Sequence, residues 1–437
     1  MKRSLKFSMF NFLLGVPFLL QAAPINFIAP EQISSPGFAI ASSGLYVLTD
    51  DVEYAAGETA ITIAADHVTL DLNGKNIQSS DGGKTGILVS ATKKNVIIKN
   101  GGVSGFSSNN IRVEAGANNL SFSNLILTGP KNGSADGLQL VGEVASPIYE
   151  VTLENCRASS FDRGVYASHA HEVKVVNSTF NFNHKVGIEA YASQNWRVTK
   201  CQASHQNGTG ATAGILCTGG KSWLLQDSDF SSNIGAAGYG AIFNADAGFA
   251  GGSHEIVSCN FSNNGGLLAR GLDLLGANVC VVRNCSFNGN FATKNAARGL
   301  NITGVGHYIE HCIADGNYAT TTEPFAATGM VIAGSAHTVD GCHVAGNVSK
   351  NGLGIGILNF ASTERCLIKN CTAVSNSTSG FQDDSKAGAN LWIGNMAWGH
   401  GEKNYVGAGP GFIEFTAGKQ PASGTFDERG VDNISVR

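Results

Sequence analysis

Polar and charged side chains recur at alternate positions around short segments that begin with glycine, such as GLQL (137–140) and GLDL (271–274). Carboxylates in such a row can act as acid and base or hold Ca²⁺, and an arginine can abstract a proton or neutralise a substrate carboxylate. The candidates are Asp136, Gln139, Arg163, Tyr166, Glu189, Arg270, Asp273, Arg298 and Asn301. A solvated face of ordinary charge pairs has a similar composition, so both interpretations stay open.

Soft metal ligands form a second set of candidates. One His or Cys stands at an equivalent place in each of five consecutive repeats: His254, Cys280, His307, His337 and Cys366. Their nitrogen and sulfur atoms suit Zn or Cu(I). A metal needs ligands that converge on a point, whereas one residue per repeat gives a line. The alternative is a polar seam in which each imidazole finds a hydrogen bond.

The elements that carry these residues are short strands. The glycine-led segments return after about 27 residues on average, and each precedes a second segment such as VTLENCRA (151–158) or CVVRNCSF (280–287). Strands this short must stack on equivalent strands of neighbouring repeats to bury their inward side chains. The pattern predicts an all-β, single-stranded parallel β-helix of about 12–13 coils, and a β-propeller is the less favoured alternative because its blades need about 40 residues.

Equivalent positions of successive coils form columns, and two columns are informative. Most of the ten cysteines share one inward column: Cys156, Cys201, Cys259, Cys285, Cys312, Cys342 and Cys371. We expect free, buried thiols there, although bridges between adjacent coils stay possible in an oxidising compartment. Five residues later, a column of amides predicts a hydrogen-bonded ladder at one corner: Asn183, Gln206, Asn233, Asn264, Asn290, Asn317, Asn347 and Asn376.

With the asparagine column, the opening AITIAADHVTLDLNGKNI (60–77) and the repeated VxIxNCxFxxN pattern carry a family resemblance. The chain resembles the right-handed parallel β-helix (pectin-lyase-like) superfamily over about residues 45–405, most closely its NosD-type and uncharacterised repeat members. The resemblance implies a right-handed coil and, more loosely, a carbohydrate connection, because function does not follow from fold. In the resembled lyases, carboxylates hold Ca²⁺ and an Arg or Lys is the base, so Ca²⁺ is implied only for a lyase.

Three short motifs also follow the order seen in polygalacturonases: SADG (134–137), QDD (382–384) and GHG (399–401). In that family, however, the first motif lies about one coil from the paired aspartates, whereas Asp136 and Asp383 are about nine coils apart here. We therefore interpret the three motifs as coincidental.

The two ends predict the domain organisation. Residues 1–22 combine Lys2, Arg3 and Lys6 with an apolar run and then small residues, which is typical of an export signal. The run is short for a membrane anchor, which needs about 20 apolar residues, so we expect no membrane span after signal removal. For the rest of the chain we predict an N-terminal cap at 23–60, the β-helix at 61–405 and a C-terminal cap at 406–437.

Charge excludes one class of partner, and two main functions remain. With 29 Lys and Arg against 33 Asp and Glu, the chain has no basic field for nucleic acid. The first function is that of a periplasmic or extracellular protein that binds or scaffolds polysaccharide, through Asp136, Gln139, Arg163, Tyr166 and Asn301. The second is a lyase, hydrolase or epimerase acting on an acidic glycan. Its catalytic candidates are Arg270, Asp273, Arg298 and Glu189. A NosD-like metal-handling function would use the His/Cys column.

Overall fold

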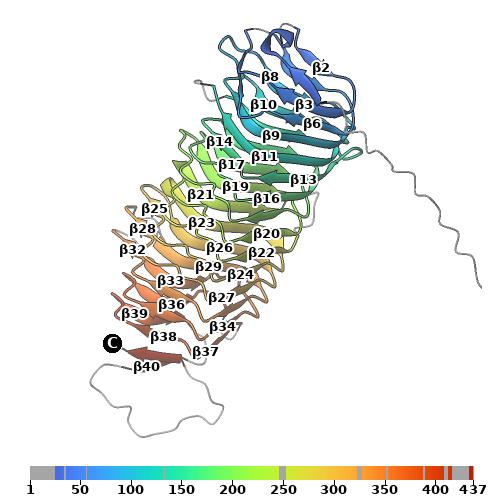
Figure 1. The fold of residues 1–437 in the computed structure, drawn as a ribbon. Coiled ribbons are helices and arrows are strands. Elements are labelled where there is room, and N and C mark those ends of the chain that lie inside the picture. Colours follow the sequence, from blue (N-terminus) through green and yellow to red (C-terminus); the bar gives the residue numbers. More distant parts are fainter. Residues whose placement is uncertain are drawn as a thin grey trace, which may run out of the picture.

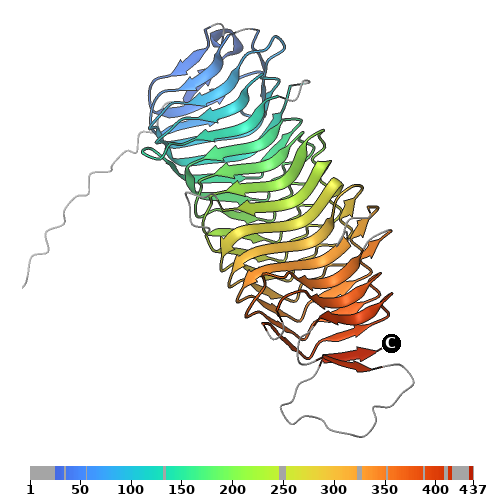
Figure 2. The same ribbon diagram turned by 180° about the vertical axis from the view of Figure 1, so that it is seen from behind.

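The computed structural model describes residues 25–33, 36–55, 57–130, 134–245, 252–321, 327–350, 353–386, 389–407, 412–415 and 433–436. Parallel strands stack into a β-solenoid of about 13 turns, which forms a rod (Figure 1). The reverse view shows that each strand lies across the rod and that the strands are stacked along it, from blue at the N-terminal end to red at the C-terminal end (Figure 2). The predicted all-β parallel coil is confirmed, while the predicted export signal lies outside the described residues. No helix in these described segments is long and apolar enough to cross a membrane.

Two long parallel sheets run the length of the rod. Sheet A contains β1 (Ile25–Ile28), β3 (Gly44–Leu48), β6 (Val68–Asp71), β9 (Lys94–Ser104), β11 (Asn118–Thr128), β13 (Ile148–Glu154), β16 (Ala170–Val176), β18 (Arg197–Thr199), β20 (Trp223–Gln226), β22 (His254–Val257), β24 (Val281–Arg283), β27 (Tyr308–Glu310), β30 (Thr338–Asp340), β34 (Leu367–Lys369) and β37 (Leu391–Ile393). Sheet B contains β2 (Phe38–Ile40), β5 (Thr59–Ile63), β8 (Thr85–Val89), β10 (Asn109–Val113), β12 (Asp136–Val141), β15 (Arg163–Ser168), β17 (Val186–Tyr191), β19 (Ala211–Thr218), β21 (Ile234–Asn244), β23 (Gly265–Asn278), β26 (Ala297–Val305), β29 (Ala327–Ser335), β33 (Gly354–Asn359), β36 (Ser379–Asp383) and β39 (Lys403–Gly407).

Shorter elements complete the coils. Beside sheet B lie β25 (Phe291–Ala292), β28 (Tyr318–Ala319) and β32 (Val348–Ser349). A third face follows sheet A in each coil and includes β4 (Val52–Glu53), β7 (Asn76–Gln78), β14 (Arg157–Ser159), β31 (His343–Ala345), β35 (Thr372–Val374), β38 (Met396–Trp398), β40 (Phe412–Phe415) and β41 (Asn433–Val436). One 3-10 helix, η1, spans Pro30–Gln32.

The predicted caps carry the same kind of pairing where the structure describes them. In the N-terminal segment 23–60, β1 pairs with β3 and β2 pairs with β5, both in parallel. In the C-terminal segment 406–437, β41 pairs with β38 and with β40. The described parts of both segments therefore extend the stacks of the coils.

The glycine that leads each sheet B segment has a steric reason. A Cβ on Gly137 would lie 2.5 Å from the carbonyl oxygen of Gly164, and a Cβ on Gly271 would lie 2.5 Å from that of Gly299. Glycine removes this clash and lets consecutive coils pack at the sheet spacing of about 4.8 Å. The sequence signal that revealed the repeat is thus a condition for stacking.

The inside of the rod holds the predicted columns. Phe261 stacks on Phe230 and Phe287, with ring centroids 5.3 and 5.4 Å apart. All ten cysteines are free and buried, and burial raises the pKa of Cys156 and Cys201 to about 11. Those two thiols therefore stay protonated at neutral pH, as expected for packing material.

The asparagine ladder is present and buried. The backbone N–H of Asn264 donates to Oδ1 of Asn290 at 3.1 Å, and Asn290 donates to Asn317 in the same way at 3.1 Å. His400 ends the ladder, because its Nδ1 accepts the N–H of Asn376 at 3.0 Å. These bonds satisfy polar groups that would otherwise be costly inside the rod.

Candidate functional site

The nine predicted polar residues lie in two adjacent columns on the outer face of sheet B. Strand register places Asp136, Arg163, Arg270 and Arg298 in one column and the other five residues in the next. They form two groups, because the three coils between Arg163 and Arg270 present apolar outer positions at Val186, Ala213, Leu216 and Ile242. The shared face is as predicted, and the division into two groups is new.

The first group is the Asp136 cluster, made of Arg112, Asp136, Gln139, Arg163, Tyr166 and Glu189. Arg163 grips Asp136 with two hydrogen bonds, from Nε to Oδ1 at 2.7 Å and from Nη2 to Oδ2 at 2.9 Å. Its Nη1 lies 3.6 Å from Oε2 of Glu189, and its guanidinium lies 4.0 Å from the ring centroid of Tyr166. The guanidinium of Arg163 therefore contacts two carboxylates and one aromatic ring.

An amide and a second arginine complete this cluster. Gln139 donates from Nε2 to Asp136 at 3.0 Å and accepts from Nη1 of Arg112 at 3.0 Å. Burial raises the pKa of Asp136 and of Glu189, although Arg163 opposes both shifts. The cluster satisfies its own charges and hydrogen bonds.

The second group is the Arg270 cluster, made of Tyr239, Arg270, Asp273, Arg298 and Asn301. Arg270 forms an ion pair with Asp273, whose side chain is only 2% exposed. Asn301 donates from Nδ2 to Oδ1 of Asp273 at 2.6 Å and accepts from Nη1 of Arg298 at 2.8 Å. Arg298 thus reaches an amide, and the one carboxylate belongs to Arg270.

This arrangement leaves a surplus positive charge. Arg270 and Arg298 occupy adjacent coils, and burial, reinforced by Arg270, lowers the pKa of Arg298 to about 10. Arg298 therefore stays protonated at neutral pH. The Nε atoms of both arginines are buried and have no hydrogen-bond partner in the described part of the chain. In the described part of the chain, the two adjacent guanidinium groups have one carboxylate as counter-charge, which favours an anionic ligand.

Calcium does not fit the outer-face carboxylates. A Ca²⁺ ion takes six to eight oxygen ligands. Asp136 and Glu189 lie on either side of the cationic Arg163, and Asp273 is paired with Arg270. A guanidinium beside each of these carboxylates would repel the ion, so no Ca²⁺ role is assigned to them.

The predicted His/Cys column is stacked in register, and its atoms make hydrogen bonds. Cys280 donates its N–H to Nδ1 of His307 at 3.1 Å, and His307 donates to Nδ1 of His337 at 3.2 Å. His254 Nδ1 accepts from Trp223, and Cys366 Sγ accepts from His337.

The second ring nitrogens are also used. Nε2 of His307 lies 3.1 Å from the oxygen of Thr303, and Nε2 of His337 lies 3.1 Å from that of Ala333. Across the described residues, no three His, Cys, Asp or Glu are placed to hold a metal ion. The geometry is that of the polar seam, and metal binding stays a prediction without a supporting coordination geometry.

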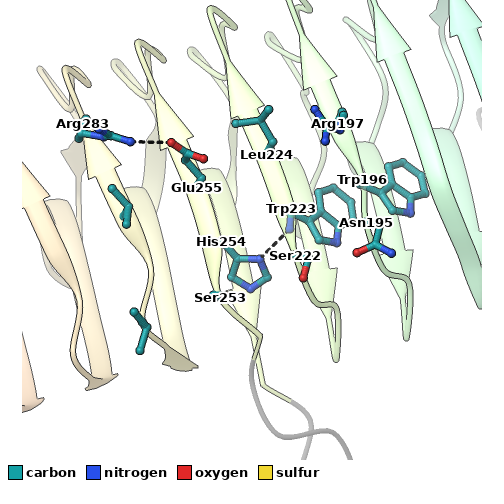
Figure 3. Close-up of a pocket in the computed structure, with 12 residues that line it drawn as sticks. Asn195, Trp196, Arg197, Ser222, Trp223, Leu224, Ser253, His254, Glu255 and Arg283 are labelled. Carbon is teal, nitrogen blue, oxygen red and sulfur yellow. Dashed lines mark hydrogen bonds and ion pairs between the residues drawn. The ribbon is translucent and has the colours of Figure 1, made fainter.

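A groove of about 600 Å³ lies on the outer face of sheet A (Figure 3). Trp196 and Trp223 stack beside it, with ring centroids 4.7 Å apart, but both side chains are buried. Arg283 and Glu255 pair across its edge at 2.6 Å. His254 is the one predicted site residue that lines it, and burial lowers its pKa to about 4. In this groove the charges of Arg283 and Glu255 neutralise each other, and His254 is uncharged at neutral pH.

The polygalacturonase-like motifs have structural roles. Asp383 accepts a hydrogen bond from Nε1 of Trp392 at 2.9 Å, and His400 ends the asparagine ladder. Asp136 belongs to its own cluster many coils away. The interpretation as coincidence agrees with these positions.

Sequence reasoning missed Tyr239 and Arg112 as members of the outer columns. Tyr239 pairs in register with Arg270, and Arg112 pairs with Gln139. The signal was available, because Tyr239 precedes Gly240 as Arg270 precedes Gly271.

Comparisons with known proteins agree with this architecture. The family described as "Right handed beta helix region" matches residues 85–248. No curated protein matches the sequence. Among solved structures, the A-module of the Azotobacter vinelandii mannuronan C-5 epimerase AlgE6 is similar at 17% identity, with a TM-score of 0.52 and coverage of 90% of both chains.

A further similar structure is a mannuronic acid specific polysaccharide family 6 lyase from human gut microbiota. It has 10% identity and a TM-score of 0.42, with coverage of 90% of this chain and 86% of that chain. At 17% identity the likeness to the AlgE6 module concerns the fold, and the closer resemblance to NosD-type members stays an expectation. The chain thus has the right-handed parallel β-helix fold.

Proposed function

We propose that this protein is exported and binds an acidic polysaccharide along the outer face of sheet B. The observation that carries the proposal is the Arg270 cluster, in which Arg270 pairs with the carboxylate of Asp273 while the adjacent Arg298 bonds to the amide of Asn301. A uronate carboxylate can accept paired hydrogen bonds from a guanidinium, which gives both charge neutralisation and orientation. The export signal in residues 1–22 is part of this proposal.

The form of the face supports a polymer as ligand. Outer positions repeat at about 4.8 Å from coil to coil, so an extended chain can contact several coils in turn. Tyr166, which is partly exposed, offers an aromatic ring to sugar residues beyond the Arg270 cluster. The epimerase module of similar fold is named for mannuronan, a polymer of uronate units, and this substrate class is compatible with the two arginines.

Catalysis on the same glycan is the second candidate, and one observation favours it. Burial raises the pKa of Asp136 and Glu189, which is the direction that a general acid needs. Both carboxylates are tied to Arg163, however, and a reaction would have to release one of them. Binding without turnover therefore stands first.

The test is titration of purified protein with alginate, polygalacturonate and neutral dextran, with absorbance of unsaturated products followed in parallel. We expect both uronate polymers to bind, dextran not to bind, and absorbance to stay flat. Arg298→Ala should weaken binding about tenfold, whereas Arg283→Ala on sheet A should not. Equal binding of dextran would overturn the uronate assignment, and rising absorbance lost in Arg270→Ala would establish a lyase.

A further inference from the structure

A groove of about 460 Å³ lies on the third face, away from sheet B. Its lining includes Ile126, Arg157, Asn181, Phe182, Gln202 and His205. The groove combines an aromatic pair, a guanidinium and two amides.

One member of the aromatic pair occupies a position that costs conformational energy. Phe182 and His205 have φ angles of 58° and 59°, in the left-handed region, which a bulky residue such as Phe avoids and His tolerates. The equivalent residues of the next three coils are Ser232, Asn263 and Gly289, which are the expected turn types.

Packing does not compensate for this cost. The Phe182 side chain is 62% exposed, and its ring centroid lies 5.3 Å from that of His205. An exposed phenyl ring in a strained turn contributes little to the core. A strained, exposed aromatic residue in a groove is an indication of ligand binding.

The polar groups have donors to spare. Asn181 donates from Nδ2 to Oε1 of Gln202 at 2.8 Å, and Gln202 donates from Nε2 to Asp229 at 3.2 Å. Each amide group has two N–H bonds, so one on each is left over. Within the described part of the chain, the guanidinium of Arg157 makes no ion pair, and Arg157 is exposed.

We propose that this groove binds one uronate residue of a glycan, as a second site separate from sheet B. The C–H face of the pyranose packs on the ring of Phe182, and His205 supports that ring from the next coil. Arg157 receives the carboxylate, and the amides of Asn181 and Gln202 donate to ring hydroxyls. A pyranose with one apolar face and one carboxylate matches these groups in both shape and charge.

The test uses a protein whose sheet B site is disabled by Arg270→Ala and Arg298→Ala. Calorimetric titration of this double variant with oligomannuronate and oligogalacturonate trimers should show one remaining site. Adding Phe182→Asn, which keeps a residue suited to the left-handed turn, should weaken that site about tenfold, and adding Arg157→Ala should do the same. Ser232→Gly, in the same turn column outside the groove, is the control and should change nothing. Thermal unfolding verifies that each variant is folded.

The outcomes separate this site from the sheet B proposal. Absence of trimer binding by the double variant, or binding unchanged by Phe182→Asn and Arg157→Ala, overturns the second site. Equally tight binding of a neutral cellotriose contradicts the role of Arg157. If wild type and double variant bind alike while Phe182→Asn abolishes binding, the groove stands and the sheet B proposal fails.

Discussion

The two clusters on sheet B use the same residue types and differ in how their charges are balanced. In the Asp136 cluster, Arg163 is shared between Asp136 and Glu189. In the Arg270 cluster, Arg298 donates to the amide of Asn301 and lies 5.9 Å from the ring centroid of Phe360, and it makes no ion pair within the described residues. The first arrangement stabilises the coil stack, and the second holds a positive charge ready for a ligand. Two clusters with the same residue types on one face therefore differ in their net charge and in their expected ability to bind an anion.

Lowering the pH should reduce the stability of the β-helix without reducing uronate binding by sheet B. This loss of stability is the largest effect that we expect. Burial lowers the pKa of His254 and His337 to about 4, below the ordinary value of 6.5. The unfolded chain then takes up protons that the folded chain refuses, so stability falls as pH drops from 6.5 toward 4. Between pH 7 and 5 we expect a loss on the order of 3 kcal/mol, measured by urea unfolding.

Uronate binding should persist over the same pH range, because Arg298 keeps its proton. A His254→Asn, His337→Asn variant is the control, and its unfolding free energy should vary less with pH. An unchanged slope in that variant would refute the role of these two imidazoles.

Removing one arginine from each cluster should have unequal effects on stability. Arg163→Ala leaves Asp136 buried without its partner and should cost about 2 kcal/mol. Arg298→Ala removes a surplus charge next to Arg270 and should cost less than about 0.5 kcal/mol. Urea unfolding measures both. Adding Asp136→Asn to Arg163→Ala should restore part of the loss, and a greater loss from Arg298→Ala than from Arg163→Ala would reverse the comparison.

Neutralising Asp136 should make the first cluster resemble the second. Asp136→Asn keeps the shape of the side chain but releases Arg163 from its strongest partner. We expect uronate affinity to rise about threefold, which titration with oligogalacturonate would detect. A decrease in affinity would instead assign Asp136 a direct contact with the glycan.

The smallest effect concerns Tyr166. Its ring lies under the guanidinium of Arg163, and such exposed cation–π contacts are worth about 0.5 kcal/mol. Tyr166→Leu should lower the unfolding free energy by that amount. A much larger loss would show that the ring holds the cluster together.

The repeat was readable from the sequence because stacking imposes one residue type per column. The glycines avoid a clash between coils, and Asn290 and its neighbours satisfy buried N–H groups, so both columns keep their residue type. The shared outer face of the nine polar residues follows from the same alternation. The columns and their inward or outward direction could be predicted from the repeat register and the two-residue period of a strand alone.

The division into two clusters and the groove around Phe182 were not readable in the same way. Whether Arg163 is satisfied depends on which carboxylates reach it across three coils, and spacing alone does not specify this. A left-handed backbone at Phe182 contradicts the preference of its residue type, so local reasoning predicts another residue there.

The central claim is that surplus charge, and not the number of charged residues, makes the ligand site. Its most direct test is the affinity for oligogalacturonate of Arg298→Ala compared with that of the paired variant Asp136→Asn, Arg163→Gln, which removes one cation and one anion together. We predict about a tenfold loss for Arg298→Ala and a change of less than about twofold for the paired variant. Equal losses in the two proteins would contradict the account.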